Sequence, residues 1–341
     1  MSGFLFQFHE PCASSDSGTE ENVVAIAPDA EAVDERVAAE WLKRFPSGDR
    51  VMRLEVDNVV ILYQRASPVP ALEAPESNQK DRRDIVAGKY YGGLKVWSCT
   101  QDIVQYYAKN DEIKQKANNG GRLLEIGCGQ GLPGIAAILL GAQHVTFHDF
   151  NLEVLELCTK PNLAANVAPR MLGAHVPTVS FCFGDWSSFN VPDALKYDII
   201  LGSDVTFDLV TCRKVAKLLS RVMSKDGVAI IGTKEYYFGT NGGHQEFRDA
   251  LLSCKSTFGG FAVGIAEKKA GNEMSRVILR ICFSDCYVLL CLHAHLFAGA
   301  PPSFKPHVCS SNFHKCCQQG LDVLPLRFIG SFVFRNCRIS C

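Results

Sequence analysis

The chain of 341 residues is long enough to bury a full hydrophobic core and has room for one large domain with appendages. Its formal net charge of −1 at pH 7 provides no basic field, so we expect no direct binding of nucleic acid. The first residues lack the basic and long apolar regions of a secretory signal, and no apolar run is long enough to span a membrane. Eight of the fifteen cysteines are scattered over residues 12–282 without paired spacing, which is typical of reduced thiols in the cytoplasm or nucleus.

Residues 1–84 are interpreted as an N-terminal extension. Its first part, 1–30, is acidic and Ser-rich and is expected to be poorly ordered. A helical pattern follows in 31–45, and 51–63 predicts one or two strands. The Pro-, Ala- and charge-rich stretch 67–83 is typical of a linker.

Residues 85–284 are predicted to form the main domain. After Trp97 we expect a helix to about Lys109, and strands and helices then alternate. Such alternation requires a mostly parallel sheet with helices on both faces, and two closing strands indicate an antiparallel hairpin at one edge. The predicted fold class is therefore α/β with a seven-strand, Rossmann-like sheet. The expected strands are 122–126, 144–149, 179–183, 197–201, 228–233, 261–266 and 275–283, and the helices are 132–140, 152–166, 209–223 and 244–255.

A glycine loop follows the first strand of this domain. Gly127, Gly129 and Gly131 lie between an apolar strand and an Ala-rich helix, where residues without Cβ allow a tight turn and let a ligand approach the backbone. Pro133 suits the first turn of that helix. The spacing differs from the Gly-x-Gly-x-x-Gly of dinucleotide sites, so the loop alone indicates only a nucleotide-type site or a plain turn.

Polar and aromatic groups follow the next strands. Asp149 lies about twenty residues after the glycines and could bind both ribose hydroxyls, or it could cap the helix that starts near Leu152. Trp186 follows the next strand and could stack on adenine, although a core position is common for Trp. Ser203 and Asp204 end the strand after that. Four strand ends thus deliver ligand-type groups to one edge of the sheet.

The tail 285–341 has a different character. Seven of the fifteen cysteines lie in it, charges are sparse, and it shows no clear periodicity. His307, Cys309, His314, Cys316 and Cys317 could be drawn as a metal cluster, but no Cys-x-x-Cys pair is present, so we expect no metal site. The tail is interpreted as a weakly structured extension that the fold does not require.

With these features in place, the chain resembles the seven-strand, S-adenosylmethionine-dependent methyltransferases. The stretch Tyr91–Thr100 (Tyr-Gly-Gly-Leu-Lys-Val-Trp-Ser-Cys-Thr) is similar to the Gly-Gly-Leu-Lys-Ile/Val-Trp-Glu-Cys-Thr pattern of the protein-histidine N-methyltransferases. Further matches are Phe147–Asn151, Pro161-Asn162, Gly184–Trp186 and Tyr236–Gly239. The resemblance covers residues 85–284 well, the first eighty residues weakly and the tail not at all.

The resemblance implies S-adenosylmethionine as the cofactor. Backbone N–H groups near Gly127 and at the start of the next helix suit the methionine carboxylate. Asp149 would bind the ribose, Trp186 the adenine, and Trp97 would line the sulfonium side. The full set of implied cofactor contacts is Val96, Trp97, Ser98, Cys99, Thr100, Gly127, Gly129, Phe147, His148, Asp149, Gly184, Asp185, Trp186 and Ser203.

The sequence departs from the family pattern at two positions. Ser98 stands where the family has Glu, and Phe207 stands where it has Tyr, so the contacts of that carboxylate and that phenol are lost. We predict Asp204 as the catalytic residue that orients the target imidazole, against the alternatives that it caps the helix near Leu209 or holds its loop. His244 is a second candidate, although a histidine on the surface or at the start of a helix explains this position better.

The resemblance points to a histidine in a large-subunit ribosomal protein as the acceptor. Two alternatives stay open: a protein-lysine N-methyltransferase of the same fold, and a non-catalytic module that binds the cofactor. We expect a monomer in the cytoplasm, with a nuclear pool implied by the resemblance alone.

Overall fold

The computed structural model describes residues 30–65, 85–86, 88–170, 177–270 and 274–284. Contacts divide the chain into two units, Met1–Leu290 and Cys291–Cys341, and the second lies outside the described residues. The expectations for 1–29, for the linker 67–83 and for the Cys-rich tail also fall outside them. Among the described helices, none is both long and apolar enough to cross a membrane.

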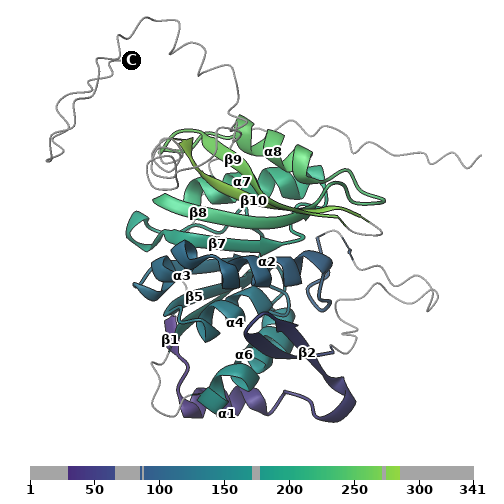
Figure 1. Cartoon of the computed structure of the whole chain (residues 1–341), viewed down its shortest axis with the longest axis vertical. Helices are drawn as coiled ribbons and strands as arrows, with labels where there is room; N and C mark the ends of the chain where they lie inside the picture. Colours follow the sequence, from purple (N-terminus) through teal and green to yellow (C-terminus); the bar gives the residue numbers. More distant parts are fainter. Residues whose placement is uncertain (1–29, 66–84, 87, 171–176, 271–273, 285–341) are drawn as a thin grey trace, which may run out of the picture. The chain divides into compact units, whose positions relative to one another are not determined.

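An eight-stranded sheet forms the centre of the molecule (Figure 1). The strands β4 to β8 run parallel, while β10 lies antiparallel between β8 and β9, so the predicted edge hairpin is confirmed. An additional strand, β1, pairs antiparallel with β6. Its three residues are all exposed, so the sequence has no apolar alternation there from which a strand could be predicted. The strands in spatial order are β1 (Ala30–Ala32), β6 (Thr178–Phe183), β5 (His144–Asp149), β4 (Arg122–Ile126), β7 (Tyr197–Ser203), β8 (Met223–Lys234), β10 (Arg276–Phe283) and β9 (Phe261–Lys269).

The central strands are buried on both faces because helices cover both sides of the sheet. Consecutive side chains of a strand point to opposite faces of the sheet and enter different cores. On β4, Leu123 packs in the first core and Leu124 in the second; on β7, Ile199 packs in the first core and Ile200 in the second. This burial explains why the parallel strands are almost continuously apolar.

Helices α2 (Ser98–Lys109), α3 (Asp111–Asn118), α4 (Leu132–Leu139) and α6 (Lys160–Val167) supply the first core. Helices α7 (Leu209–Val222) and α8 (His244–Ser253) supply the second. The remaining helical elements are α1 (Glu35–Leu42), α5 (Leu152–Val154), the π-helical turn η2 (Leu155–Thr159) and the short 3₁₀ turns η1 (Gly48–Arg50), η3 (Ala168–Arg170) and η4 (Asp193–Leu195).

The helix predicted over 152–166 is interrupted by the π-helical turn η2. Pro161 has no N–H to donate to the carbonyl of Leu157 four residues earlier, and the side chain of Gln64 donates to that carbonyl instead. Helix α3 is absent from the sequence prediction. Its first turn is capped by Asn110, whose Oδ1 accepts from the Ile113 N–H at 3.1 Å.

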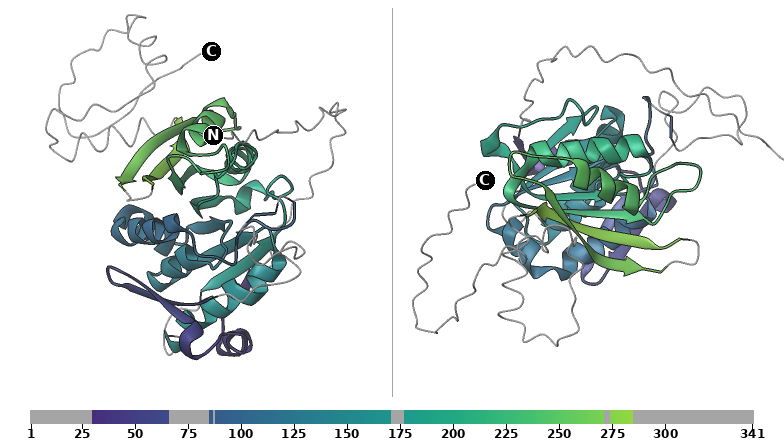
Figure 2. Two further views of the ribbon diagram at one scale, coloured as in Figure 1. Left: turned by 90° about the vertical axis from the view of Figure 1, so that its right-hand side faces the viewer. Right: turned by 90° about the horizontal axis from the view of Figure 1, so that it is seen from above.

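The N-terminal hairpin β2 (Val51–Val56) and β3 (Val59–Gln64) packs on α6 (Figure 2). Asn166 accepts from the Leu62 N–H at 2.8 Å and donates to the Leu62 carbonyl at 2.7 Å. Asn162 accepts from the Gln64 N–H at 3.0 Å. Two helix side chains therefore complete the hydrogen bonding of an edge strand, and they attach residues 51–64 to the main domain.

Candidate functional site

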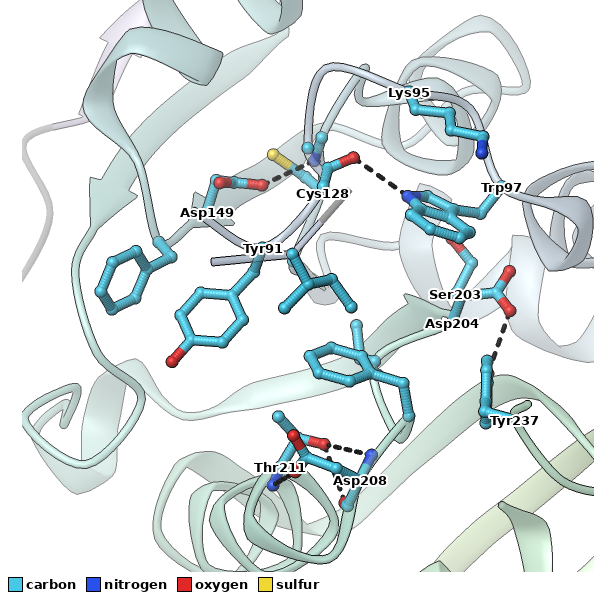
Figure 3. Close-up of a pocket in the computed structure, with 18 of the residues that line it drawn as sticks. Tyr91, Lys95, Trp97, Cys128, Asp149, Ser203, Asp204, Asp208, Thr211 and Tyr237 are labelled. Atoms are coloured by element: carbon cyan, nitrogen blue, oxygen red, sulfur yellow. Dashed lines mark hydrogen bonds between the residues drawn. The ribbon is translucent and has the colours of Figure 1, made fainter. Parts of the chain in front are cut away.

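A cavity of about 500 Å³ opens at the carboxyl ends of the parallel strands (Figure 3). Most of the predicted site residues line it, although they come from five separate stretches of sequence. Those in the wall are Val96, Trp97, Thr100, Gly127, Gly129, Asp149, Gly184, Asp185, Trp186, Ser203 and Asp204.

Four residues predicted to contact the cofactor do not line the cavity. Phe147 and His148 alternate on β5 and point into the cores on the two sides of the sheet. Ser98 is exposed in the first turn of α2, whereas Cys99 is buried beneath it. Burial lowers the pKa of His148 to about 4, so its ring is uncharged at neutral pH.

The glycine loop has the backbone that only glycine adopts without strain. Gly127, Gly129 and Gly131 have φ angles of 55°, 52° and 76°. A Cβ at Gly129 would lie 2.9 Å from the Gly93 carbonyl, and one at Gly127 would lie 2.8 Å from a methyl of Val205. The loop therefore packs directly against the segments that contain Gly93 and Val205, with no space for a side chain at these two glycines.

Several N–H groups around this loop are already donated within the protein. Gly129 N–H binds Asp149, Cys128 N–H binds the His148 carbonyl at 2.8 Å, and Gly134 N–H binds the buried Glu125 carboxylate at 2.7 Å. Burial raises the pKa of Glu125 well above its usual range. The predicted use of this helix start for a ligand carboxylate stays a prediction.

Asp149 lies at the end of β5 and is 5 % exposed. One carboxylate oxygen accepts from the Gly129 N–H at 2.9 Å and the other from the Asn151 N–H at 3.1 Å. Burial raises its pKa to about 6, although these backbone hydrogen bonds act in the opposite direction. Asn151, not Asp149, precedes α5 as its N-cap residue, so the helix-capping alternative is wrong.

Trp186 forms an apolar wall beside Gly127. Its indole N–H is buried without a partner among the described groups, which is unusual for a buried donor. The neighbouring Asp185 pairs with Lys214 and accepts from the Ser187 N–H at 2.8 Å. The Lys214 ammonium and these hydrogen bonds hold the pKa of Asp185 below its usual range, although its partial burial acts the other way.

Asp204 connects β7 to α2. Its Oδ2 accepts from the Cys99 N–H at 2.8 Å in the first turn of α2, and its Oδ1 accepts from the Tyr237 hydroxyl at 3.0 Å (Figure 3). Its φ of 56° is left-handed, a conformation that costs free energy for a residue with Cβ. Asp208, not Asp204, caps α7 through a reciprocal pair with Thr211. Asp204 thus holds its loop and helix α2, while a direct role in catalysis stays a prediction.

Two lysines lie near the Trp97 ring. The Lys95 ammonium is 4.6 Å from the ring centroid and the Lys234 ammonium is 5.8 Å from it. The indole N–H donates to the Gly92 carbonyl at 3.0 Å. The aromatic face that we expected to favour a ligand's positive charge therefore already interacts with cations of the protein itself.

The sequence prediction missed Lys95, Lys234 and Tyr237 as pocket residues. Tyr237 supplies a phenol beside Asp204, whereas the ring of Phe207 lies 6.1 Å from that of Tyr91. The available signal was Tyr236–Gly239, which matched the family pattern but carried no assigned role. The second candidate, His244, begins α8 and is absent from the pocket lining.

The sheet order, with the glycine loop after β4 and the reversed hairpin at the edge, defines a Rossmann-like methyltransferase fold. Residues 86–247 match the model of a family described as lysine methyltransferase. The match includes the stretch before Trp97, the glycine loop and the strand ends that form the cavity.

The expected resemblance to protein-histidine methyltransferases is confirmed. The chain is 36 % identical over 173 residues to a histidine protein methyltransferase 1 homolog of Dictyostelium discoideum, covering 50 % of this chain and 52 % of that protein. It is 31 % identical over 187 residues to the homolog of Mus musculus, covering 48 % and 51 %. The chain spans about half the length of the curated relatives it matches.

Among solved structures, a TehB-like, S-adenosylmethionine-dependent methyltransferase from Corynebacterium glutamicum is 15 % identical, with a TM-score of 0.35. The similarity covers 54 % of this chain and 98 % of that chain.

The cavity itself fits a nucleoside cofactor. Its volume of about 500 Å³ falls in the range of small-molecule sites, ~300–1,000 Å³. The glycine backbone lets such a ligand approach closely, and the buried carboxylate of Asp149 can accept further hydrogen bonds from it. The indole N–H of Trp186 has no partner among the described groups and can donate to it.

Proposed function

We propose that the protein is an S-adenosylmethionine-dependent protein-histidine N-methyltransferase. The observation that carries the proposal is the convergence of the glycine loop, Asp149, Trp186 and Asp204 on one cavity. The similarity to proteins named histidine protein methyltransferase supports the same activity.

In this proposal the cofactor supplies a methyl group on a positively charged sulfur. Asp149 accepts hydrogen bonds from the ribose, and Trp186 stacks on the adenine. Ser203, which lies 3.2 Å from the Thr100 hydroxyl, contributes backbone beside the adenine. The glycine loop lets all of these groups approach the ligand closely.

The acceptor is a neutral imidazole, which already has a lone pair near pH 7. One ring nitrogen forms the new N–C bond while the S–C bond breaks, and the electron pair of that bond stays on sulfur. The other ring nitrogen then loses its proton. Asp204 orients the ring through that nitrogen and receives the proton or passes it to water. Most of the rate enhancement comes from alignment of the nucleophile, the carbon and the sulfur.

The substrate class is a protein, and the resemblance favours a histidine of a large-subunit ribosomal protein. The decisive experiment is incubation of the full chain with labelled S-adenosylmethionine and purified ribosomal proteins, followed by amino-acid analysis. We expect label in methylhistidine. Methyllysine as the sole product would contradict the proposal.

A lysine acceptor is the second candidate, because the matching family model is described as lysine methyltransferase. The same amino-acid analysis separates the two acceptors. A binding module without turnover is separated by titration calorimetry, since it would bind S-adenosylhomocysteine but transfer no label.

For the cell we propose a cytoplasmic monomer with a nuclear pool. The described cysteines from Cys99 to Cys254 form no disulfide, which supports a reducing compartment. Fractionation of cells that express the tagged full chain tests the location. Light scattering tests the monomer.

A further inference from the structure

Lys234 is a cation inside the proposed acceptor region that the proposed chemistry has not used. It is the last residue of β8, and its side chain is 21 % exposed. The ammonium lies 3.8 Å from Asp204 Oδ1, 5.2 Å from the Tyr237 ring centroid and 5.8 Å from the Trp97 ring centroid. It therefore lines the cavity beside the residue proposed to orient the acceptor.

Near the Trp97 ring, two ammonium groups, those of Lys95 and Lys234, line the cavity together with one carboxylate, that of Asp204, so this part of the cavity wall is not anionic. Asp204 already accepts from the Cys99 N–H and the Tyr237 hydroxyl. Lys95 adds a second cation above the Trp97 ring. On the strand paired with β8, Arg276 lies opposite Lys234 in register and binds Asp102 at 2.5 Å.

All four aspartates in the cavity wall are committed to groups of the protein. Asp149 binds two backbone N–H groups, and Asp185 pairs with Lys214. Asp204 faces Lys234, and Asp208 accepts from the Thr211 N–H at 2.7 Å. Within the described part of the cavity, each carboxylate thus already has a donor or a cation of the protein.

We propose that Lys234 determines acceptor specificity by excluding a protonated amine and admitting a neutral imidazole. The inference rests on the proposed methyl transfer to a protein side chain. An acceptor lysine would enter as an ammonium, and in this partly desolvated cavity the like charges would repel each other. A neutral imidazole meets no such repulsion, and the cavity wall offers it the aromatic side chains of Trp97, Phe207 and Tyr237 for packing.

The same ammonium acts on the protonation of a bound imidazole. A nearby positive charge lowers the pKa of the imidazole, so more of the acceptor has its lone pair available at neutral pH. It also favours loss of the proton from the methylated, cationic ring.

The test uses two synthetic peptides of the sequence found modified in the labelled incubation, one with His and one with Lys at the acceptor position. We compare wild type with Lys234→Gln, with Lys234→Arg, which keeps the charge, and with Lys43→Gln as an exposed control at the C-cap of helix α1. For Lys234→Gln we expect the ratio of kcat/KM for the His peptide to that for the Lys peptide to fall about tenfold. Lys234→Arg and Lys43→Gln should stay within twofold of the wild-type ratio.

A second readout separates selection by charge from simple damage to the site. With the His peptide, the acid limb of the kcat–pH profile should move to higher pH by about half a unit to one unit in Lys234→Gln and not in Lys234→Arg. The affinity for S-adenosylhomocysteine, measured by calorimetry on the same samples, shows that the pocket is intact.

If labelled incubation yields no methylhistidine at all, the proposed function fails. If the wild type forms methylhistidine but Lys234→Gln changes neither the His-to-Lys ratio nor the pH profile, only the role of Lys234 is overturned.

Discussion

At the residue scale, Asp149 shows how burial changes the pKa of a residue that is predicted to bind the cofactor. The carboxylate was predicted from its place at a strand end, but its pKa of about 6 follows from burial, which only the packed structure shows. The ionised form, which accepts hydrogen bonds from ribose hydroxyls, predominates above this pKa and is lost as the pH falls through it.

We therefore predict that affinity for S-adenosylhomocysteine falls several-fold between pH 7.5 and pH 5. Calorimetric titrations across this range measure the effect. Asp149→Asn cannot titrate, so it should bind more weakly at pH 7.5 and show little pH dependence. An equally steep profile in Asp149→Asn would assign the titration to another group.

Asp204 gives the second prediction at this scale. Asp204→Asn preserves the size of the side chain and one acceptor oxygen, but it removes the negative charge that would receive the imidazole proton. We expect turnover to fall about 100-fold, a typical contribution of general acid–base catalysis, with cofactor affinity nearly unchanged. Full turnover with normal cofactor affinity would limit Asp204 to its observed contacts with Cys99 and Tyr237.

At the element scale, the attachment of the β2–β3 hairpin depends on side chains of α6. Sequence patterns predicted strands near residues 51–63, because apolar residues alternate there. They could not predict that Asn162 and Asn166 would bind those strands, since the partners lie about a hundred residues apart in the chain. The π-helical turn η2 has a similar origin, because Gln64 satisfies the carbonyl that Pro161 leaves without its usual donor.

We predict that Asn166→Ala lowers the free energy of unfolding by about 2 kcal/mol. It leaves a backbone N–H and a carbonyl of Leu62 without their partner, and each such loss costs ~1–3 kcal/mol when the group stays buried and less when water replaces the partner. Urea denaturation at constant pH measures the change. Asn190→Ala, which removes a contact only with the adjacent Val191 N–H, should stay within about 0.5 kcal/mol of wild type.

At the scale of the whole molecule, ligand binding tests the cofactor assignment without any turnover. A ligand present at 100 times its Kd stabilises the native state by ~2.7 kcal/mol. For a domain of this size, each kcal/mol shifts Tm by ~2–4 °C. We therefore expect S-adenosylhomocysteine to raise Tm by about 5–10 °C in a thermal melt. A comparable rise with NAD, and none with S-adenosylhomocysteine, would contradict the assignment.

The sequence by itself determined the class of the fold and the edge of the sheet that holds the site. Buried parallel strands must be apolar, glycine is the residue that adopts positive φ without strain, and polar residues at the carboxyl ends of parallel strands meet at one edge. These are local rules, so the location of Gly127, Asp149 and Trp186 at this edge of the sheet could be predicted from the sequence, while their contacts with a cofactor stay predictions.

The tertiary structure alone decided which side chains face the cavity and which groups satisfy one another. Phe147 and His148 lie in the cores. The carboxylate of Asp204 accepts hydrogen bonds from Cys99 and Tyr237, and the Lys234 ammonium lies beside this carboxylate. The physical reason is that contacts between distant segments depend on packing and burial, which no spacing along the chain records. Burial also raises the pKa of Asp149 and lowers that of His148, which their positions in the sequence do not indicate.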